Sequence, residues 1–192
     1  NIMIISSYNT TFPPDIRQSP ETGLIQQIIP IQSGNILDIG CGCGKQSIVL
    51  ATNNNKVLGI DLQDWMIDYA IKNNSNENTT YLCEDFMTYD FEDKNFEIII
   101  SQNVFFHIKD KETLLKKIYD LLKIGGQFIF TDLTQHNTEH NDDNLAYPVE
   151  PPFYSKLLNE IGFTNVLFLW EKHWIWNGQY SGKNFCMFKC YK

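Results

Sequence analysis

The segment that most constrains the fold is a short apolar strand that runs directly into three glycines at every second position. It is the stretch ILDIGCGCG at residues 36–44, and a helical pattern begins at about residue 46. Glycine permits positive φ and leaves no side chain over the backbone, so a ligand can approach the chain closely. The N-terminus of the following helix offers free N–H groups. The segment therefore predicts a strand–loop–helix unit with a ligand-binding loop.

Beyond this unit the chain alternates strand-like and helix-like segments. The apolar patterns predict strands at 35–39, 56–60, 79–83, 96–101 and 127–132, and helices at 46–51, 63–72 and 111–123. Strands that are apolar on both faces and separated by helices indicate a parallel sheet. A helix over 151–161 then precedes two strands, 166–171 and 183–191, with no helix between them. We therefore expect an α/β fold: a seven-stranded, mostly parallel sheet with a late antiparallel hairpin strand and helices on both faces.

Length and charge narrow the function classes. The 192 residues suffice for one domain with its own core, which we expect at 34–192, preceded by an N-terminal lid or helix segment at 1–33. The 15 basic and 23 acidic residues give a formal charge of −8, which disfavours broad binding to nucleic acid. There is no apolar run of membrane-spanning length, and five cysteines, an odd number, disfavour a disulfide framework. We expect a cytoplasmic protein with no membrane partner.

The spacing around the glycines separates two kinds of nucleotide site. Asp61 ends the next strand about twenty residues later, where a carboxylate can accept both hydroxyls of a ribose. A dinucleotide loop would place its third glycine one position later, where this chain has Lys45, and Asp38 lies two places before the first glycine. With that acidic residue and the glycine spacing, the segment resembles the first motif of the class I S-adenosylmethionine-dependent methyltransferases.

The resemblance continues in register through residues 35–133. Stretches 59–62, 83–86, 96–103 and 121–128 look like the family's later motifs. It implies a Rossmann-like fold that binds S-adenosyl-L-methionine and releases S-adenosyl-L-homocysteine. Asp61 would hold the ribose, Asp85 the adenine amino group, and Asp38 the cationic aminoacyl end. The remaining expected cofactor residues are Gly40, Cys41, Gly42, Gly44, Leu62, Met66, Phe86 and Gln102.

The acceptor side carries a weaker signature. Methyl transfer from a sulfonium is an in-line displacement, for which a general base is optional. The strand over 96–101 ends near Asn103 and His107, the two candidate catalytic residues. A histidine here is frequent in the small-molecule branch of the family, where it commonly shapes the site without being the base. Asp132 ends the next strand, and we expect a capping or solvent-facing group. We expect no metal site, because His136 and His140 lie in a polar loop and Cys186 and Cys190 share one face of a strand.

Two further features leave alternatives open. The polar stretch 135–147 fits either a lid over the acceptor or a surface loop. Trp170, Trp174, Trp176 and Tyr180 fit core packing or a homodimer contact better than an amine cage. The best prediction is a methyltransferase acting on N, O or S of a small molecule. The alternatives are a nucleic-acid or protein methyltransferase, or a non-catalytic cofactor-binding partner subunit.

Overall fold

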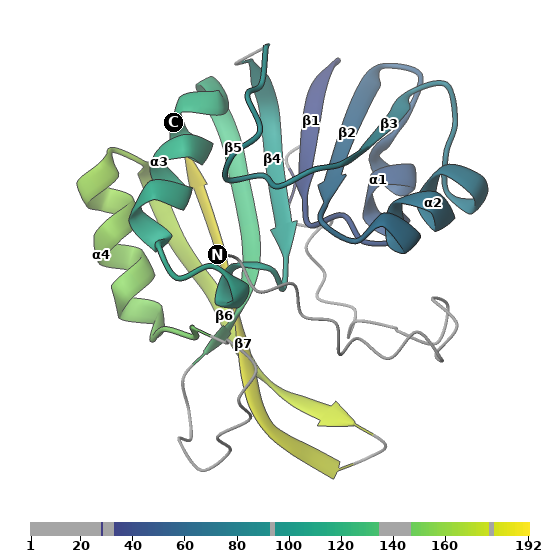
Figure 1. Cartoon of the computed structure of the whole chain (residues 1–192). Coiled ribbons are helices and arrows are strands. Elements are labelled where there is room, and N and C mark those ends of the chain that lie inside the picture. The colour runs from purple at the N-terminus through teal and green to yellow at the C-terminus, as the bar shows by residue number, and fades with distance from the viewer. Residues whose placement is uncertain (1–27, 29–32, 93–94, 135–146, 177–178) are drawn as a thin grey trace.

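A seven-stranded sheet organises the chain (Figure 1). The computed structural model describes residue 28 and residues 33–92, 95–134, 147–176 and 179–192, without the side chains of residues 170 and 172–183. The strand order is β3-β2-β1-β4-β5-β7-β6. In chain order the strands are β1 (Gly34–Ile39), β2 (Asn55–Asp61), β3 (Thr79–Cys83), β4 (Phe96–Gln102), β5 (Leu122–Thr134), β6 (Thr164–Trp176) and β7 (Gln179–Tyr191). This confirms the predicted mostly parallel sheet with a late antiparallel hairpin.

The centre of the sheet is the place where a ligand site is expected. Strand β1 pairs in parallel with β2 on one side and with β4 on the other. The chain therefore winds outward in one direction through β2 and β3 and in the other through β4 and β5. In open α/β sheets, ligands bind outside the carboxyl ends of the strands at such a switch point. The glycine loop and the segment after β4 lie at that point.

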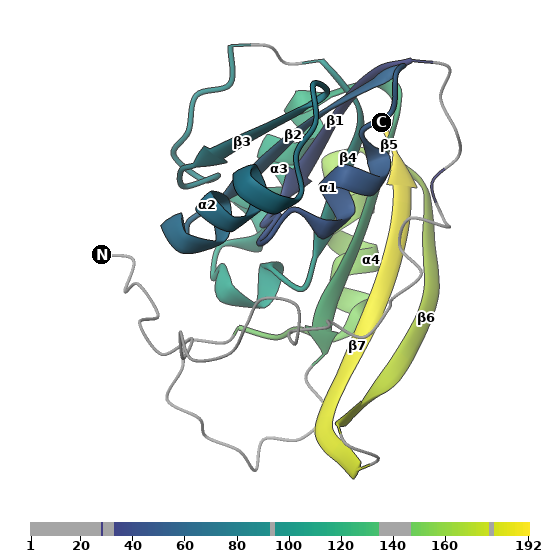
Figure 2. The ribbon, with the colours of Figure 1, turned by 90° about the vertical axis from the view of Figure 1, so that its right-hand side faces the viewer.

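Helices cover both faces of the sheet (Figures 1 and 2). Helices α1 (Lys45–Leu50) and α2 (Asp64–Asn73) lie on one face, and α3 (Lys111–Leu121) and α4 (Pro151–Ile161) on the other. Alternation along β1 sends Leu37 and Ile39 into the core beneath α3 and α4, and Ile36 into the core beneath α1. None of the helices in the described ranges has the length and apolar character of a transmembrane segment.

The largest core is built around stacked aromatic rings. Phe130 lies at its centre, 4.9 Å from the ring centroids of both Phe105 and Phe128 and 5.0 Å from that of Tyr154. Its ring also lies 5.4 Å from that of Phe188 on β7. Aromatic contacts of this kind add about 0.5–1.5 kcal/mol each beyond the buried area. The core thus joins β5, β7, α4 and the short 3-10 turn η2 (Phe105–His107) into one packed unit.

Some boundaries differ from the sequence-based expectation. Helix α3 ends at Leu121 and not at 123, because Leu122 is buried and already pairs with Phe96 as the first residue of β5. The hairpin strands β6 and β7 are each 13 residues long. The pairing of β5 with β7 ends at Thr134 and Asn184, while β6 and β7 continue to pair to Trp176 and Gln179. The hairpin of β6 and β7 therefore extends beyond the carboxyl end of β5 (Figure 2).

Several expectations fall outside the described residues. These are the lid or helix segment, except residues 28 and 33, the loop 135–147 up to residue 146, and the side chains of Trp170, Trp174, Trp176 and Tyr180. The choice between core packing and a homodimer contact for these aromatic residues stays a prediction. Cys186 and Cys190, in contrast, are fully buried on β7, as expected for core cysteines.

Candidate active site

The glycine loop joins the carboxyl end of β1 to α1. Gly40, Gly42 and Gly44 all have positive φ, at +69°, +51° and +74°. A Cβ built on Gly40 would lie 2.1 Å from a methyl group of Val104, in the segment after β4. On Gly42 the same atom would meet, among the described residues, only the Met66 sulfur, at 3.5 Å. The loop is therefore pressed against the segment after β4 at its first glycine and has open space over its second, as a bound ligand requires.

Asp61 connects this loop to the end of β2. One carboxylate oxygen accepts the N–H of Gly42 at 2.9 Å, and the other accepts the N–H of Gln63 at 2.9 Å. Burial raises the pKa of Asp61, and the backbone N–H groups oppose that shift. Each carboxylate oxygen can accept a second hydrogen bond, so the group can still receive ligand hydroxyls. Asp61 thus shapes the glycine loop and can still accept hydrogen bonds from a ligand beside that loop.

Asp38 lies deeper than its motif position suggests. It is buried beneath the loop, and one oxygen accepts the hydroxyl of Ser47 at 2.6 Å. Burial raises the pKa of Asp38 to about 7, the Ser47 hydrogen bond opposes this, and the charge of Asp61 adds to it. Two further groups near Asp38 do not titrate near neutrality. Burial raises the pKa of Tyr81 to about 12 and that of the Cys41 thiol further still.

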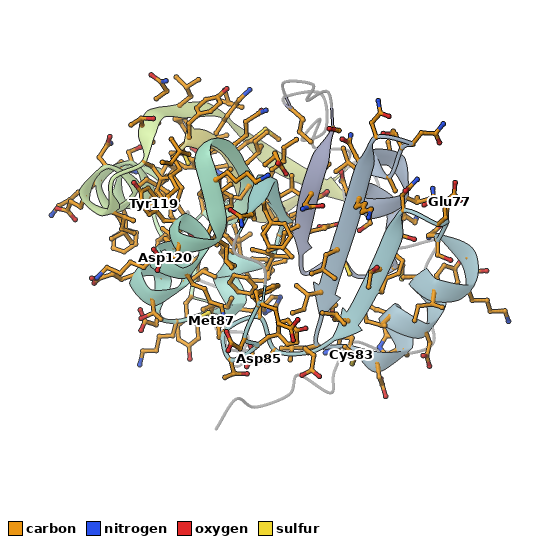
Figure 3. All side chains as sticks on the ribbon, turned by 90° about the horizontal axis from the view of Figure 1, so that it is seen from above. Glu77, Cys83, Asp85, Met87, Tyr119 and Asp120 are labelled. Atoms are coloured by element: carbon orange, nitrogen blue, oxygen red, sulfur yellow. The ribbon has the colours of Figure 1, made fainter. Side chains whose placement is uncertain are left out.

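The residues expected around the adenine lie at the ends of β2 and β3. Asp85 follows Cys83, the last residue of β3 (Figure 3). One oxygen of its carboxylate accepts the N–H of Met87 at 2.8 Å, which orders the turn that follows. Leu62 is 54% exposed, so an apolar side chain is accessible beside the end of β2. Phe86 differs from the expectation, because its ring is only 6% exposed and packs in the core against Phe91.

The segment after β4 brings the acceptor-side candidates to the same edge. Gln102 accepts a hydrogen bond from the side chain of Gln46 on α1, whose own carbonyl oxygen is buried without a partner among the described residues. Asn103 has φ +59°, and its amide group is anchored on Thr131 of β5 at 2.9 Å. A non-glycine residue in the left-handed region is uncommon, and such strain is found preferentially at functional sites.

His107 ends the turn η2. Its Nδ1 atom is buried and has no partner in the described part of the chain, and its ring centroid lies 4.0 Å from that of Phe106. Burial lowers the pKa of His107, and the cationic Lys111 lowers it further. The imidazole is therefore neutral at physiological pH, the form that can accept a proton.

Three residues behind this turn were missed or misread from the sequence. Asp132 is completely buried, which excludes the solvent-facing alternative and leaves the capping one. It accepts the N–H of Phe106 at 2.8 Å and the hydroxyl of Tyr154 at 2.5 Å. Lys111 is also buried, and it donates to the carbonyls of Phe105 and Ile108. One signal could have revealed Lys111: it lies three, four and seven positions before buried apolar residues of α3, on the same stripe.

Comparison with known proteins agrees with this geometry. Residues 37–130 match the sequence model of a family described as "Methyltransferase domain". Phosphoethanolamine N-methyltransferase 2 of Caenorhabditis elegans is 32% identical over 68% of this chain and 32% of its own length. The ubiquinone biosynthesis O-methyltransferase of Coxiella burnetii is 30% identical over 58% of this chain and 49% of its own.

A solved structure confirms the fold. Phosphoethanolamine N-methyltransferase 2 of Haemonchus contortus, in complex with S-adenosyl-L-methionine, superposes with a TM-score of 0.74 at 19% identity. The match covers 88% of this chain and 51% of that one. The sequence matches and the fold together assign the chain to the class I S-adenosylmethionine-dependent methyltransferases, a family of enzymes whose cofactor is S-adenosyl-L-methionine. The chain spans 28% to 49% of the length of the first curated relatives that it matches.

Proposed function

We propose that this protein transfers the methyl group of S-adenosyl-L-methionine to N, O or S of a small-molecule acceptor by in-line displacement. The observation that carries the proposal is the glycine loop, which Asp61 ties to β2 and which leaves open space over Gly42. A ligand that contacts the backbone closely needs such a loop, with no side chain over its second glycine. The relatives named for phosphoethanolamine and for ubiquinone biosynthesis support a small-molecule acceptor.

The residues present fit this cofactor. Asp61 would accept the ribose hydroxyls, Asp85 the adenine amino group, and the exposed Leu62 with Met66 would cover the adenine ring. The buried carboxyl of Asp38 and the backbone from Gly40 to Gly42 would meet the aminoacyl end, with Gln102 beside them. Phe86 would support the pocket from the core. When bound, the cofactor supplies an activated methyl group on a sulfonium, which is a good leaving group.

On the acceptor side the chain has to exclude water and align the nucleophile. Asn103 holds the end of β4 on Thr131, and His107 follows one turn later. We propose that neutral His107 faces the acceptor and takes its proton when that acceptor is a hydroxyl, a thiol or an ammonium group. A thiolate or a neutral amine would need His107 only for orientation.

The five cysteines are consistent with the compartment that we propose. Among the described residues, Cys41, Cys83, Cys186 and Cys190 form no disulfide, and three of these four are buried. Free thiols without disulfides are typical of a reducing environment. This supports a cytoplasmic protein.

Calorimetry with S-adenosyl-L-methionine and with S-adenosyl-L-homocysteine tests cofactor binding. We expect both to bind, and Asp61→Ala to weaken binding by about tenfold or more, since a half-buried charged hydrogen-bond acceptor is lost. Asp68→Ala, which removes an exposed carboxylate from α2, is the matched control and should bind normally. If neither ligand binds the wild-type protein at millimolar concentration, the proposal is wrong.

A labelled methyl group then identifies the acceptor class. Methyl transfer is measured into a small-molecule extract and, in parallel, into RNA, DNA and protein pools. Label in the small-molecule fraction supports the proposal. Label confined to a macromolecular pool, or cofactor binding without transfer into any pool, contradicts it in favour of the alternative classes.

A further inference from the structure

The turn η2, which carries His107, is too short to hold its own position. It has two backbone hydrogen bonds of its own, from His107 to Val104 at 3.0 Å and from Ile108 to Phe105 at 2.8 Å. A single 3-10 turn has poor hydrogen-bond geometry and few bonds, so its position depends on its surroundings. What surrounds this turn therefore decides where the His107 ring lies.

Asp132, at the end of β5, holds the middle of the turn. One of its oxygens accepts the N–H of Phe106 at 2.8 Å, and the other accepts the hydroxyl of Tyr154 on α4 at 2.5 Å. The side chains of Asp132 and Tyr154 are both completely buried. The hydroxyl of Tyr154 therefore orients the carboxylate, and the carboxylate orients the turn.

Lys111, the first residue of α3, holds the two ends of the turn. Its ammonium group donates to the carbonyl of Phe105 at 2.6 Å and also to that of Ile108. It is buried, and its charge lies close enough to Asp132 to lower the pKa of that carboxyl against the larger effect of burial. β5, α3 and α4 thus converge on one turn of three residues.

Burying a lysine and an aspartate removes two charged groups from water, which costs free energy. Apolar side chains of similar volume often stabilise such a site equally well or better, because they avoid the desolvation of two charges. Hydrogen bonds from charged groups, however, define the place and orientation of a backbone segment much more narrowly than apolar contacts do. The arrangement therefore fits a requirement for position better than one for stability.

We propose that Asp132, Tyr154 and Lys111 are positioning residues for methyl transfer, which hold the turn η2 so that His107 meets the acceptor in a reactive orientation. This inference rests on the proposed function, since it gives His107 a role at the acceptor. None of the three residues needs to touch the cofactor or the acceptor. The cofactor residues Asp38, Asp61 and Asp85 make none of the hydrogen bonds described for this turn.

The test variant is Tyr154→Phe, which removes one hydroxyl and keeps the ring packed against Phe130 and Phe188. Tyr119→Phe on α3, whose ring packs against Phe163 in the same core, is the matched control. We expect Tyr154→Phe to accelerate hydrogen exchange of the Phe106 amide by about tenfold and to shift the imidazole NMR signals of His107. The rate of methyl transfer into the small-molecule extract should fall by about tenfold or more. The dissociation constant for S-adenosyl-L-methionine should change by less than about twofold.

Asp132→Asn is the second variant, because it keeps the shape and removes the charge. Asp132→Asn should also slow methyl transfer while leaving cofactor affinity nearly unchanged. If the role of Asp132 were merely structural, the variant would unfold at a lower temperature, and its folded form would keep the wild-type transfer rate and cofactor affinity. The inference is overturned if Phe106 exchange and the His107 signals in Tyr154→Phe match those of wild type and Tyr119→Phe. Failure of wild type to bind the cofactor would overturn the proposed function instead, so the two failures are distinguishable.

Discussion

The two halves of the proposed site, one for the cofactor and one for the acceptor, are built by different means. On the cofactor side, the loop after β1 takes its shape from glycines with positive φ and from backbone N–H groups that bind Asp61. On the acceptor side, the turn after β4 takes its position from buried ionisable side chains of β5, α3 and α4. The first kind of construction is local in sequence and the second is not. The shape of the first half therefore depends mainly on conformational restriction at glycine, and that of the second on contacts between distant elements.

In the cofactor half, the substitution with the largest expected effect is Gly40→Ala. A methyl group here would overlap Val104 and hold alanine at φ +69°, so we expect a loss of about 3–5 kcal/mol in unfolding free energy. Gly125→Ala is the control, because Gly125 has φ +78° and a Cβ built there meets no described residue within 4 Å. It should cost only about 1–2 kcal/mol. Equal losses in urea denaturation would show that contact with Val104 does not constrain the loop.

The corresponding test of the acceptor half is Lys111→Met. Methionine replaces the apolar stem but leaves two carbonyls without their donor and Asp132 without a nearby cation, so we expect a loss of about 3 kcal/mol. Lys109→Met removes an exposed lysine two residues earlier and should stay within about 0.5 kcal/mol of wild type. A Lys111→Met protein as stable as wild type would mean that apolar packing alone holds this half.

The pH dependence of stability distinguishes the buried carboxyl of the cofactor half. Because the pKa of Asp38 is raised to about 7 by burial, folding favours its protonated form. That contribution is complete below pH 4 and is lost as the pH rises toward 7, with a limiting slope of about 1.4 kcal/mol per pH unit. Asp38→Asn removes this slope.

The measurement is denaturant unfolding at a series of pH values, and the difference between wild type and Asp38→Asn isolates one carboxyl from Asp61 and Asp132. Asp68→Asn, an exposed change on α2, should keep the wild-type slope. Parallel profiles for wild type and Asp38→Asn would contradict a raised pKa at Asp38.

The smallest expected effect concerns Lys117, which links the two halves. It donates to the carbonyls of Met87 and Tyr89 at 3.2 and 2.6 Å, and it lies 5.2 Å from the centroid of the Phe86 ring. Lys117→Met should lower the unfolding free energy by about 1–2 kcal/mol. It should also weaken cofactor binding a few-fold, because Asp85 and Phe86 directly precede the residues whose carbonyls Lys117 binds. Lys116→Met, an exposed neighbour, should leave cofactor affinity unchanged in calorimetry. If both variants bind the cofactor like wild type, α3 does not support the adenine side.

The sequence predicted much of the fold because its signals are local. Apolar runs and glycines placed the seven strands and four α-helices of the described residues, although their ends were misjudged and the 3-10 turn η2 was missed. Helix α3 was expected to reach 123 because leucines continue its pattern, but pairing of Leu122 with Phe96 ends it earlier. The hairpin was underestimated because β6 and β7 pair with each other beyond the sheet.

The candidate site divides in the same way. Asp61 follows the glycines at a characteristic interval, and the structure places its carboxylate on the N–H of Gly42 in the same loop, while its role at the ribose stays a prediction. Asp132 was misread because a carboxylate at a strand end resembles a surface group when only its neighbours in sequence are considered. Its partners lie 26 and 22 residues away, at Phe106 and Tyr154.

The amino-acid sequence by itself determined the strand–loop–helix unit, the parallel sheet and the family, because conformational restriction at glycine and apolar periodicity act between residues close in the chain. Only the tertiary structure decided which carboxylates are buried, which lysine enters the core and what holds the turn that carries His107. Burial and hydrogen bonding depend on which elements meet in space, and α3, α4 and β5 meet at this turn only after the sheet has formed.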